Sequence, residues 1–166
     1  MHNNLLLDAE LIQRKLARMA YEIWERYSEE KTLYLLPIEQ SGRAIAESLA
    51  QQLRSFSPLE VKIVPLTVDK KVPLAPAALP EGTVLDGRSA VVIDDVANSG
   101  KTLFYALKPL LSFDLKSLAI AVLVDRRHKS FPIRPDVVGH AFATTLQDHI
   151  EVSTEGGIPV AAYLRQ

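Results

Sequence analysis

Two adjacent carboxylates, Asp94 and Asp95, separate an apolar run at 90–93 from a turn of small and polar residues. Such a run is typical of a strand buried on both faces, and the leucines after the turn recur with helical spacing. The turn therefore stands at a helix N-terminus, where unpaired N–H groups and the helix dipole favour a phosphate. Ionised carboxylates only accept hydrogen bonds, so the two acids suit the adjacent hydroxyls of a ribose. Together these residue types indicate a site for a phosphorylated sugar.

The turn also contains groups that bring the backbone close to an anion. Gly100 has no Cβ, so the chain can approach a ligand there, and the hydroxyls of Ser99 and Thr102 can donate hydrogen bonds. The tripeptide 100–102 also resembles the end of a nucleotide-binding P-loop, but that motif needs a glycine where Asp95 stands. An ATPase or GTPase is therefore disfavoured. A plain turn or helix cap remains the alternative interpretation of the two acids.

Helices and strands alternate along the chain, and these elements must position the turn. Apolar residues recur with helical period over 11–27 and 43–54, and short apolar runs at 33–38, 61–66 and 118–124 are typical of strands. Strands separated by helices indicate an α/β fold with a central, mainly parallel sheet flanked by helices. The apolar stripe of the first helix is predicted to lie either in the core or on a dimer face.

Three loops that follow predicted parallel strands, 39–42, 95–100 and 125–129, should meet at one edge of the sheet, because ligands of such sheets bind beyond the carboxyl ends of the strands. Asp125 ends one of these strands. It is either a helix cap, an ion-pair partner of the arginines beside it, or a ligand of Mg²⁺. The densest basic run of the chain follows, with Arg126, Arg127, His128 and Lys129. Such a run is either a solvated face or the surroundings of a polyphosphate or base.

Residues 67–87 interrupt the regular pattern with three prolines and two glycines, and Lys70 and Lys71 stand near the start of the segment. We expect a mobile surface loop there, and it is a candidate lid over the site. The last part of the chain shows short strand patterns at 137–138, 150–152 and 160–164.

The composition is that of a single globular domain spanning 1–166. Hydrophobic residues make up 48% and charged residues 23% of the chain, which suits an independent core. The absence of cysteine excludes disulfides, thiolate zinc sites and cysteine nucleophiles. No apolar run reaches the length of a membrane span and no signal-peptide pattern opens the chain, so we expect a cytoplasmic protein without a membrane partner. The formal net charge of −1 gives no general attraction to nucleic acid.

Two stretches resemble a known family. Residues 90–102 combine four apolar positions, two acids and then Val-Ala-Asn-Ser-Gly-Lys-Thr, and they resemble the phosphoribosyl-pyrophosphate (PRPP) motif of the type I phosphoribosyltransferases. Residues 118–139, which include Val-Asp-Arg-Arg-His-Lys, are similar to the same region of the bifunctional pyrimidine-operon regulator/uracil phosphoribosyltransferase group. The resemblance covers most of the chain and implies the fold of that family, with a small hood formed by C-terminal segments.

The resemblance implies a role for each of the three loops, and it makes Asp94 and Asp95 the catalytic carboxylates. It implies that the 5-phosphate of PRPP is bound by Ala97, Asn98, Ser99, Gly100, Lys101 and Thr102. Pyrophosphate would be bound by Gln40, Ser41, Gly42 and Arg43. The side that holds the base and pyrophosphate would include Asp125, as the ligand of Mg²⁺, with Arg126, Arg127 and His128.

The implied reaction is displacement of pyrophosphate from C1 of PRPP by a ring nitrogen of a nucleobase, with uracil as the first candidate. Uracil-type relatives have a basic residue where Ser41 stands, and some purine-using relatives have an acid where Asn98 stands. Asn98 cannot accept a proton from the base as that acid does, which favours a uracil-type site. The amphipathic first helix is consistent with a homodimer or homotetramer.

Two other functions stay open. The first is a regulator that binds pyrimidine-operon leader RNA, to which Lys15, Arg18 and Arg26 would contribute together with the basic run. The second is a PRPP or nucleotide sensor that binds its ligand without turnover.

Overall fold

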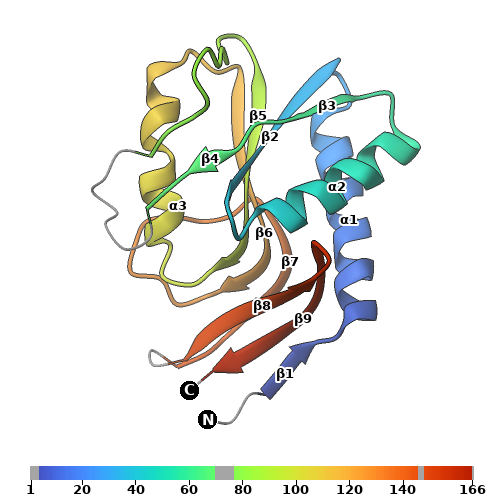
Figure 1. Cartoon of the computed structure of the whole chain (residues 1–166), viewed down its shortest axis with the longest axis vertical. Helices are drawn as coiled ribbons and strands as arrows, with labels where there is room; N and C mark the ends of the chain where they lie inside the picture. Colours follow the sequence, from blue (N-terminus) through green and yellow to red (C-terminus); the bar gives the residue numbers. More distant parts are fainter. Residues whose placement is uncertain (1–3, 70–76, 146–147, 166) are drawn as a thin grey trace.

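The computed structural model describes residues 4–69, 77–145 and 148–165, which form two sheets with helices packed on them (Figure 1). The larger sheet is parallel, with strand order β3-β2-β5-β6-β7 and a short β4 that also pairs with β2. Its strands are β2 (Thr32–Glu39), β3 (Glu60–Ile63), β4 (Leu66–Thr67), β5 (Ser89–Ala97), β6 (Ser117–Arg126) and β7 (Val137–Phe142). The predicted fold class is confirmed.

A small antiparallel sheet with strand order β1-β9-β8 lies at one end of the molecule, beside the carboxyl ends of β5 and β6 (Figure 1). We call this sheet the hood. Its strands are β1 (Asn4–Leu7), β8 (His149–Glu155) and β9 (Ile158–Arg165). The first and last parts of the chain therefore meet over the edge of the larger sheet where ligands of parallel sheets bind.

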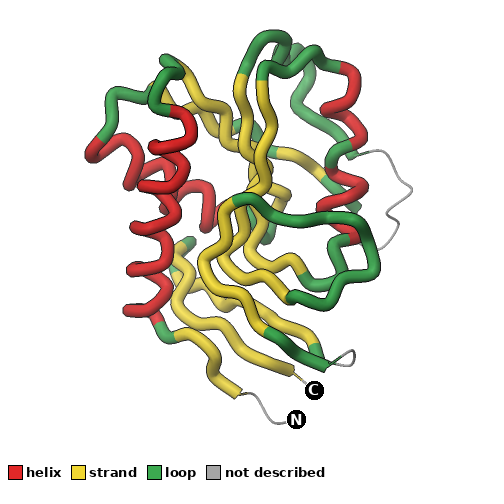
Figure 2. The backbone as a smooth tube through the Cα atoms, turned by 180° about the vertical axis from the view of Figure 1, so that it is seen from behind, coloured by secondary structure: helices red, strands yellow, loops and turns green. Residues whose placement is uncertain are grey.

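Helices cover both faces of the larger sheet (Figure 2). One face carries α1 (Ala9–Tyr27) and α2 (Arg43–Phe56), and the other carries α3 (Lys101–Ala106) and the 3-10 helix η1 (Lys108–Ser112). Side chains of β5 alternate between the two faces, because Val91 and Ile93 pack with α1 and α2 while Ala90 and Val92 pack with α3. The central strand is buried on both sides as its apolar run predicted.

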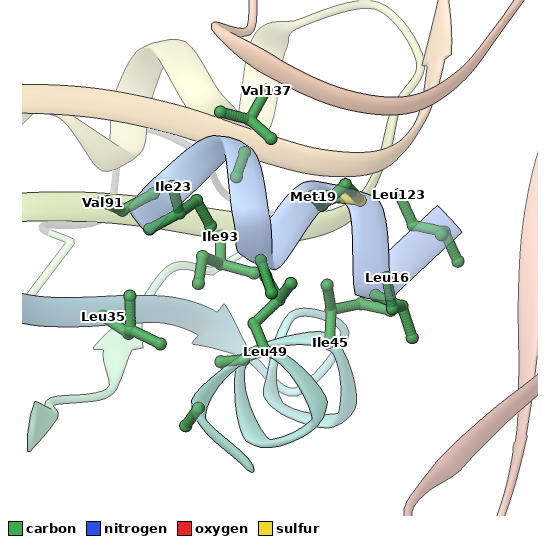
Figure 3. Packing of buried hydrophobic residues seen from close by; sticks show 14 of the residues in the cluster. Leu16, Met19, Ile23, Leu35, Ile45, Leu49, Val91, Ile93, Leu123 and Val137 are labelled. Atoms are coloured by element: carbon green, nitrogen blue, oxygen red, sulfur yellow. The ribbon is translucent and has the colours of Figure 1, made fainter. Parts of the chain in front are cut away.

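The first helix is held to the sheet by its apolar stripe. Asp8 caps the helix by accepting a hydrogen bond from Leu11 N at 2.9 Å. Its buried residues are Ile12, Leu16, Met19, Ala20, Ile23 and Tyr27. Figure 3 shows Met19 beside Leu123 of β6, and Ile23 beside Val91 and Ile93 of β5. Of the two predicted places for this stripe, the core is the one observed. Within the described part of the chain, no helix has the length and apolar character needed to cross a bilayer.

The segment predicted as a loop at 67–87 is only partly described, since Lys70 and Lys71 lie outside the described residues. Its ends are anchored to the fold. Thr67 N donates to Ala78 O at 2.9 Å and Ala78 N donates to Thr67 O at 3.0 Å, which forms an isolated antiparallel bridge. Leu85 is fully buried against the face that carries α3. The role of this segment as a lid stays a prediction.

Candidate functional site

The three predicted loops follow β2, β5 and β6 and lie at the carboxyl edge of the parallel sheet. Adjacent strands are in register at this edge, where Ala97 at the end of β5 pairs with Asp125 near the end of β6. The hood lies next to the same edge (Figure 1). The loops after β2 and β5 and the hood strand β8 enclose two neighbouring cavities.

The two acids at the end of β5 differ in their surroundings. Asp94 is only 2% exposed, and its Oδ1 accepts hydrogen bonds from Ser41 Oγ at 2.5 Å and from Asp95 N at 2.9 Å. Asp95 is partly exposed, and its Oδ1 accepts from Val96 N at 2.7 Å. Asp94 thus ties the loop after β2 to the end of β5, while Asp95 presents its carboxylate to the cavities.

The larger cavity has a volume of about 930 Å³ and lies between the loop after β2 and the hood. Its charged lining residues are Glu39, Arg43, Glu47 and Asp95. The hood contributes Val152, Thr154 and Gly157. Three carboxylates and one guanidinium therefore face this space among the described residues.

The smaller cavity has a volume of about 430 Å³ and is lined by every residue from Asp94 to Leu103. Arg126 lines it from β6, and the hood contributes His149, Ile150 and Glu151. Asp95 lines both cavities. A ligand that lies across Asp95 can thus reach the small-residue turn with one end and the loop after β2 with the other.

The small-residue turn has the backbone that the sequence predicted. Gly100 has φ of +81°, in the left-handed region that favours glycine, and a Cβ there would lie 3.3 Å from Ile133 Cβ. Ser99 Oγ accepts a hydrogen bond from Lys101 N at 3.2 Å. The helix that follows has only six residues, because Pro109 has no N–H and the chain continues as a 3-10 turn. Backbone N–H groups of the turn, rather than a long helix dipole, are the donors available to an anion.

Asn98 makes a contact that the sequence did not indicate. Its Nδ2 donates to Ile150 O and its Oδ1 accepts from Ile150 N, both at 3.1 Å. The side chain therefore joins the small-residue turn to the hood. No local pattern could have predicted this pairing, because Ile150 is 52 residues away in sequence.

The loop after β2 contains the four residues predicted to bind pyrophosphate, and all except Gly42 line the larger cavity. The peptide bond between Glu39 and Gln40 is cis. Arg43 is paired with Glu39 at 3.1 Å and lies 3.5 Å from Glu47. The guanidinium of Arg43 is therefore shared between two carboxylates at the mouth of this cavity.

Gly42 stands where this loop passes closest to β5. A Cβ at position 42 would lie 2.2 Å from Ile93 O and 2.9 Å from Ile38 N, and both are backbone atoms. The φ of Gly42 is −79°, which any residue can adopt. Close contact with the sheet, and not backbone conformation, therefore requires glycine here.

Gly42→Ala is expected to lower the free energy of unfolding by about 3 kcal/mol or more, because neither backbone group can yield without distorting the sheet. Urea denaturation measures the change. Gly82→Ala is the matched control, since Gly82 has φ of +81° and a Cβ there would meet nothing within 4 Å. Backbone strain alone should cost the control about 1–2 kcal/mol. A loss in Gly42→Ala no larger than that of the control would contradict the close contact.

Asp125 has an ion-pair partner in the structure. Lys129 Nζ forms an ion pair with Asp125 Oδ1 and also donates to Arg126 O at 2.6 Å. Asp125 lines neither cavity. Arg127 and His128 are exposed and line neither cavity either. Of the three alternatives for Asp125, the ion pair is present, although its partner is Lys129 and not an arginine.

Arg126 behaves differently from its neighbours in the basic run. It is 7% exposed, and its guanidinium donates to Thr144 Oγ1 at 2.9 Å and to Thr145 O at 3.0 Å. The hydroxyl and amide of Thr145 in turn donate to Asp148 Oδ2, which together with the nearby Arg126 lowers the pKa of Asp148. Arg126 therefore fixes the segment that leads into the hood while it lines the smaller cavity.

The acidic groups of the site fit a magnesium ion only together with a ligand. Among the described residues, no group of three His, Asp or Glu side chains is placed to hold a metal ion. Mg²⁺ in proteins is commonly held by one or two carboxylates plus substrate phosphates. Glu39 and Asp95 line the larger cavity and fit that pattern better than Asp125, which lines neither cavity.

The basic residues predicted to contact RNA are mostly in other contacts. Arg18 pairs with Glu22 and donates to Val138 O at 2.9 Å, and Arg26 lies 3.5 Å from Asp136. His140 lies near Lys15 and Arg18. Its burial and these two positive charges lower its pKa below 6.5. His140 therefore adds no positive charge to this surface at neutral pH.

This shift predicts a pH dependence of stability. The unfolded chain protonates His140 near pH 6.5, whereas the folded chain does so only at lower pH, so stability falls as the pH drops through this interval. The free energy of unfolding of His140→Gln, measured by urea denaturation from pH 7.5 to 5, should fall less steeply than that of the wild type. Parallel pH curves for the two proteins would contradict the shift.

A parallel sheet, paired acids before a small-residue turn and a hood over their edge define the phosphoribosyltransferase class. Residues 2–151 match the family model for the phosphoribosyl transferase domain, and the chain belongs to this family. It is similar to proteins named Bifunctional protein PyrR. The relative from Limosilactobacillus reuteri is 32% identical over 161 residues, covering 90% of each chain. The relative from Citrifermentans bemidjiense is 31% identical over 166 residues, covering 93% of each chain. The predicted membership of the phosphoribosyltransferase family is confirmed, and the relatives at about 30% identity are PyrR proteins.

Solved structures share the fold at lower sequence identity. The hypoxanthine phosphoribosyltransferase of Trypanosoma cruzi superposes with a TM-score of 0.78 at 18% identity and 95% coverage of both chains. A hypoxanthine-guanine phosphoribosyltransferase from Bacillus anthracis gives a TM-score of 0.77 at 17% identity, covering 98% of this chain and 97% of that one. The likeness to these purine enzymes is one of fold.

Proposed function

We propose that this protein transfers the 5-phosphoribosyl group of PRPP to a nucleobase, with uracil as the acceptor and pyrophosphate as the leaving group. The observation that carries the proposal is the position of Asp95, which lines both cavities. In the binding pose that we propose for PRPP, the ribose lies beside Asp95 and the 5-phosphate enters the smaller cavity. The pyrophosphate then lies in the larger cavity beside the loop after β2.

In the reaction, the bond between C1 of the ribose and the pyrophosphate oxygen breaks, and a bond from a ring nitrogen of the base to C1 forms. The proton of that nitrogen passes to the released pyrophosphate or to solvent. By analogy with glycoside cleavage, positive charge develops on the ribose as the bond breaks. The Asp94 carboxylate accepts hydrogen bonds from Ser41 Oγ and Asp95 N, and the Asp95 carboxylate accepts one from Val96 N, so both would stabilise this charge without reorganising.

The larger cavity would bind the pyrophosphate leaving group. Gln40, Ser41 and Arg43 line it and would bind the pyrophosphate oxygens. Glu39 and Asp95 would hold a Mg²⁺ ion that arrives with PRPP, and the ion would supply positive charge to the departing pyrophosphate. The hood residues Val152 and Thr154 close the opposite side of the cavity and would limit the access of water to C1.

Two features favour a pyrimidine acceptor. The relatives that share about 30% of the sequence are PyrR proteins. Position 98 carries an amide in place of a carboxylate, so it cannot take a proton from a purine, and its Nδ2 and Oδ1 each bond the backbone of Ile150. Incubation with PRPP, Mg²⁺ and uracil, hypoxanthine, guanine, xanthine, adenine or orotate in turn tests the acceptor. A nucleoside monophosphate should appear with uracil, and a product with another base alone would reject uracil.

The alternative is a regulator that binds PRPP, a nucleotide or leader RNA with little catalysis. Arg18, Arg26 and Lys129, three of the basic residues predicted to contact RNA, are engaged in ion pairs, which weakens this alternative. Affinity for a pyrimidine-operon leader that falls with salt, in a protein that binds PRPP without turnover, would favour this alternative.

A further inference from the structure

The contact between Asn98 and Ile150 is a reciprocal pair that resembles one rung of a sheet. Both bonds of the amide are 3.1 Å long, one to Ile150 O and one from Ile150 N. β8 is an edge strand of the hood, since the strand order is β1-β9-β8. Ile150 turns both of its backbone groups away from β9 and toward Asn98, and the residue is only 1% exposed. Asn98 therefore takes the place of a neighbouring strand at this point.

We infer that Asn98 is a positioning residue that fastens the hood to the small-residue turn, so that both cavities are formed before PRPP binds. The inference rests on the proposed function for its effect on catalysis. The residues on either side of Ile150, His149 and Glu151, line the smaller cavity. Val152 and Thr154, further along β8, line the larger one. The position of β8 thus sets one wall of each cavity, and Asn98 holds that strand at its edge.

The pairing also limits what other side chains can do at position 98. The amide donates with one end and accepts with the other, and Ile150 offers one group of each kind. Aspartate keeps the acceptor toward Ile150 N, but it brings a second anionic oxygen against Ile150 O. Protonated aspartate restores a donor. In the Asn98→Asp variant, the hood should therefore be released when the new carboxyl is ionised and fastened when it is protonated.

Three variants test this inference. Asn98→Leu removes both hydrogen bonds and keeps the branched shape of the side chain, and Asn98→Asp removes only the donor. Asn4→Asp is the matched control, because it makes the same chemical change on an exposed residue of the hood strand β1. Hydrogen exchange at the amide of Ile150 is the direct readout, because this N–H donates its hydrogen bond to Asn98 Oδ1. Steady-state kinetics with PRPP is the functional readout.

Ile150 should exchange at least about tenfold faster in Asn98→Leu than in the wild type, since two hydrogen bonds are lost. In Asn98→Asp its exchange, relative to the wild type at the same pH, should slow again as the pH falls toward the pKa of the new carboxyl. The KM for PRPP should rise about tenfold with a smaller change in kcat. Unchanged exchange at Ile150 in Asn98→Leu, or a pH effect equal in Asn4→Asp, would overturn the inference.

The readouts separate this inference from the proposed function. If the wild type does not turn over PRPP while Ile150 loses protection in Asn98→Leu, the fastening holds and the proposed catalysis fails. If the wild type turns over PRPP and the KM for PRPP is the same in all variants, catalysis holds and the positioning role fails.

Discussion

Asparagine in place of Asp95 is expected to lower kcat/KM for pyrophosphate release by roughly 10²–10³-fold, the loss typical of removing one preorganised electrostatic group. Asp95 lines both cavities, and the proposed function places the ribose of PRPP beside its carboxylate. Asparagine keeps the shape and the oxygen that accepts from Val96 N. The loss should therefore come from the missing charge and not from the fold.

The control for this substitution is Asp86→Asn. Asp86 lies outside both cavities, where its Oδ1 accepts from Asp114 N at 2.8 Å. The rate of pyrophosphate release from PRPP is measured for both variants in the presence of uracil and Mg²⁺. Urea denaturation checks that both are folded. A full rate in Asp95→Asn would remove Asp95 from the catalytic site. An equal loss in Asp86→Asn would show that the effect is not local.

Removal of divalent cations is expected to slow turnover of PRPP by roughly 10³-fold or more, because a metal ion contributes several kcal/mol of charge stabilisation. The charges that line the larger cavity explain why a divalent cation is needed. Glu39, Glu47 and Asp95 face it with the single guanidinium of Arg43, and Arg43 is itself shared between the two glutamates. Pyrophosphate would meet net negative charge there unless a cation arrived with it.

Chelation should act on turnover and leave the fold intact. Among the described residues no group of three His, Asp or Glu side chains is placed to hold a metal, so the melting temperature should be the same with and without chelator. Excess Mg²⁺ added after the chelator should restore the rate. Full turnover with the chelator present would contradict the account of the larger cavity, and a large drop in melting temperature would indicate a structural ion.

The sequence was sufficient where the information is local. The apolar run before Asp94 and the small-residue turn after Asp95 predicted the strand, the turn and their place at the sheet edge. Local signals also explain two differences. The strand predicted at 61–66 is divided into β3 and β4 around Pro65, which has no N–H, and the helix after the turn stops before Pro109 for the same reason.

The rest of the candidate site depends on contacts between distant segments. His149, Glu151 and Val152 line the cavities because β8 joins β9 and β1 into the hood, and no periodicity of the sequence specifies that arrangement. The partner of Asn98 is likewise a backbone group, which has no signature in the sequence. Asp125 and Lys129 are only four residues apart, but the sequence around Asp125 fitted a metal ligand equally well.

Phosphorus NMR of PRPP with Mg²⁺, uracil and the wild-type protein tests the central claim most directly. The account predicts that the PRPP resonances disappear while those of pyrophosphate and a nucleoside monophosphate grow in equal amounts. The double variant Asp94→Asn/Asp95→Asn should leave PRPP unchanged over the same time. PRPP that binds to the wild type but stays intact with every base would contradict the enzyme and leave a sensor or regulator in its place.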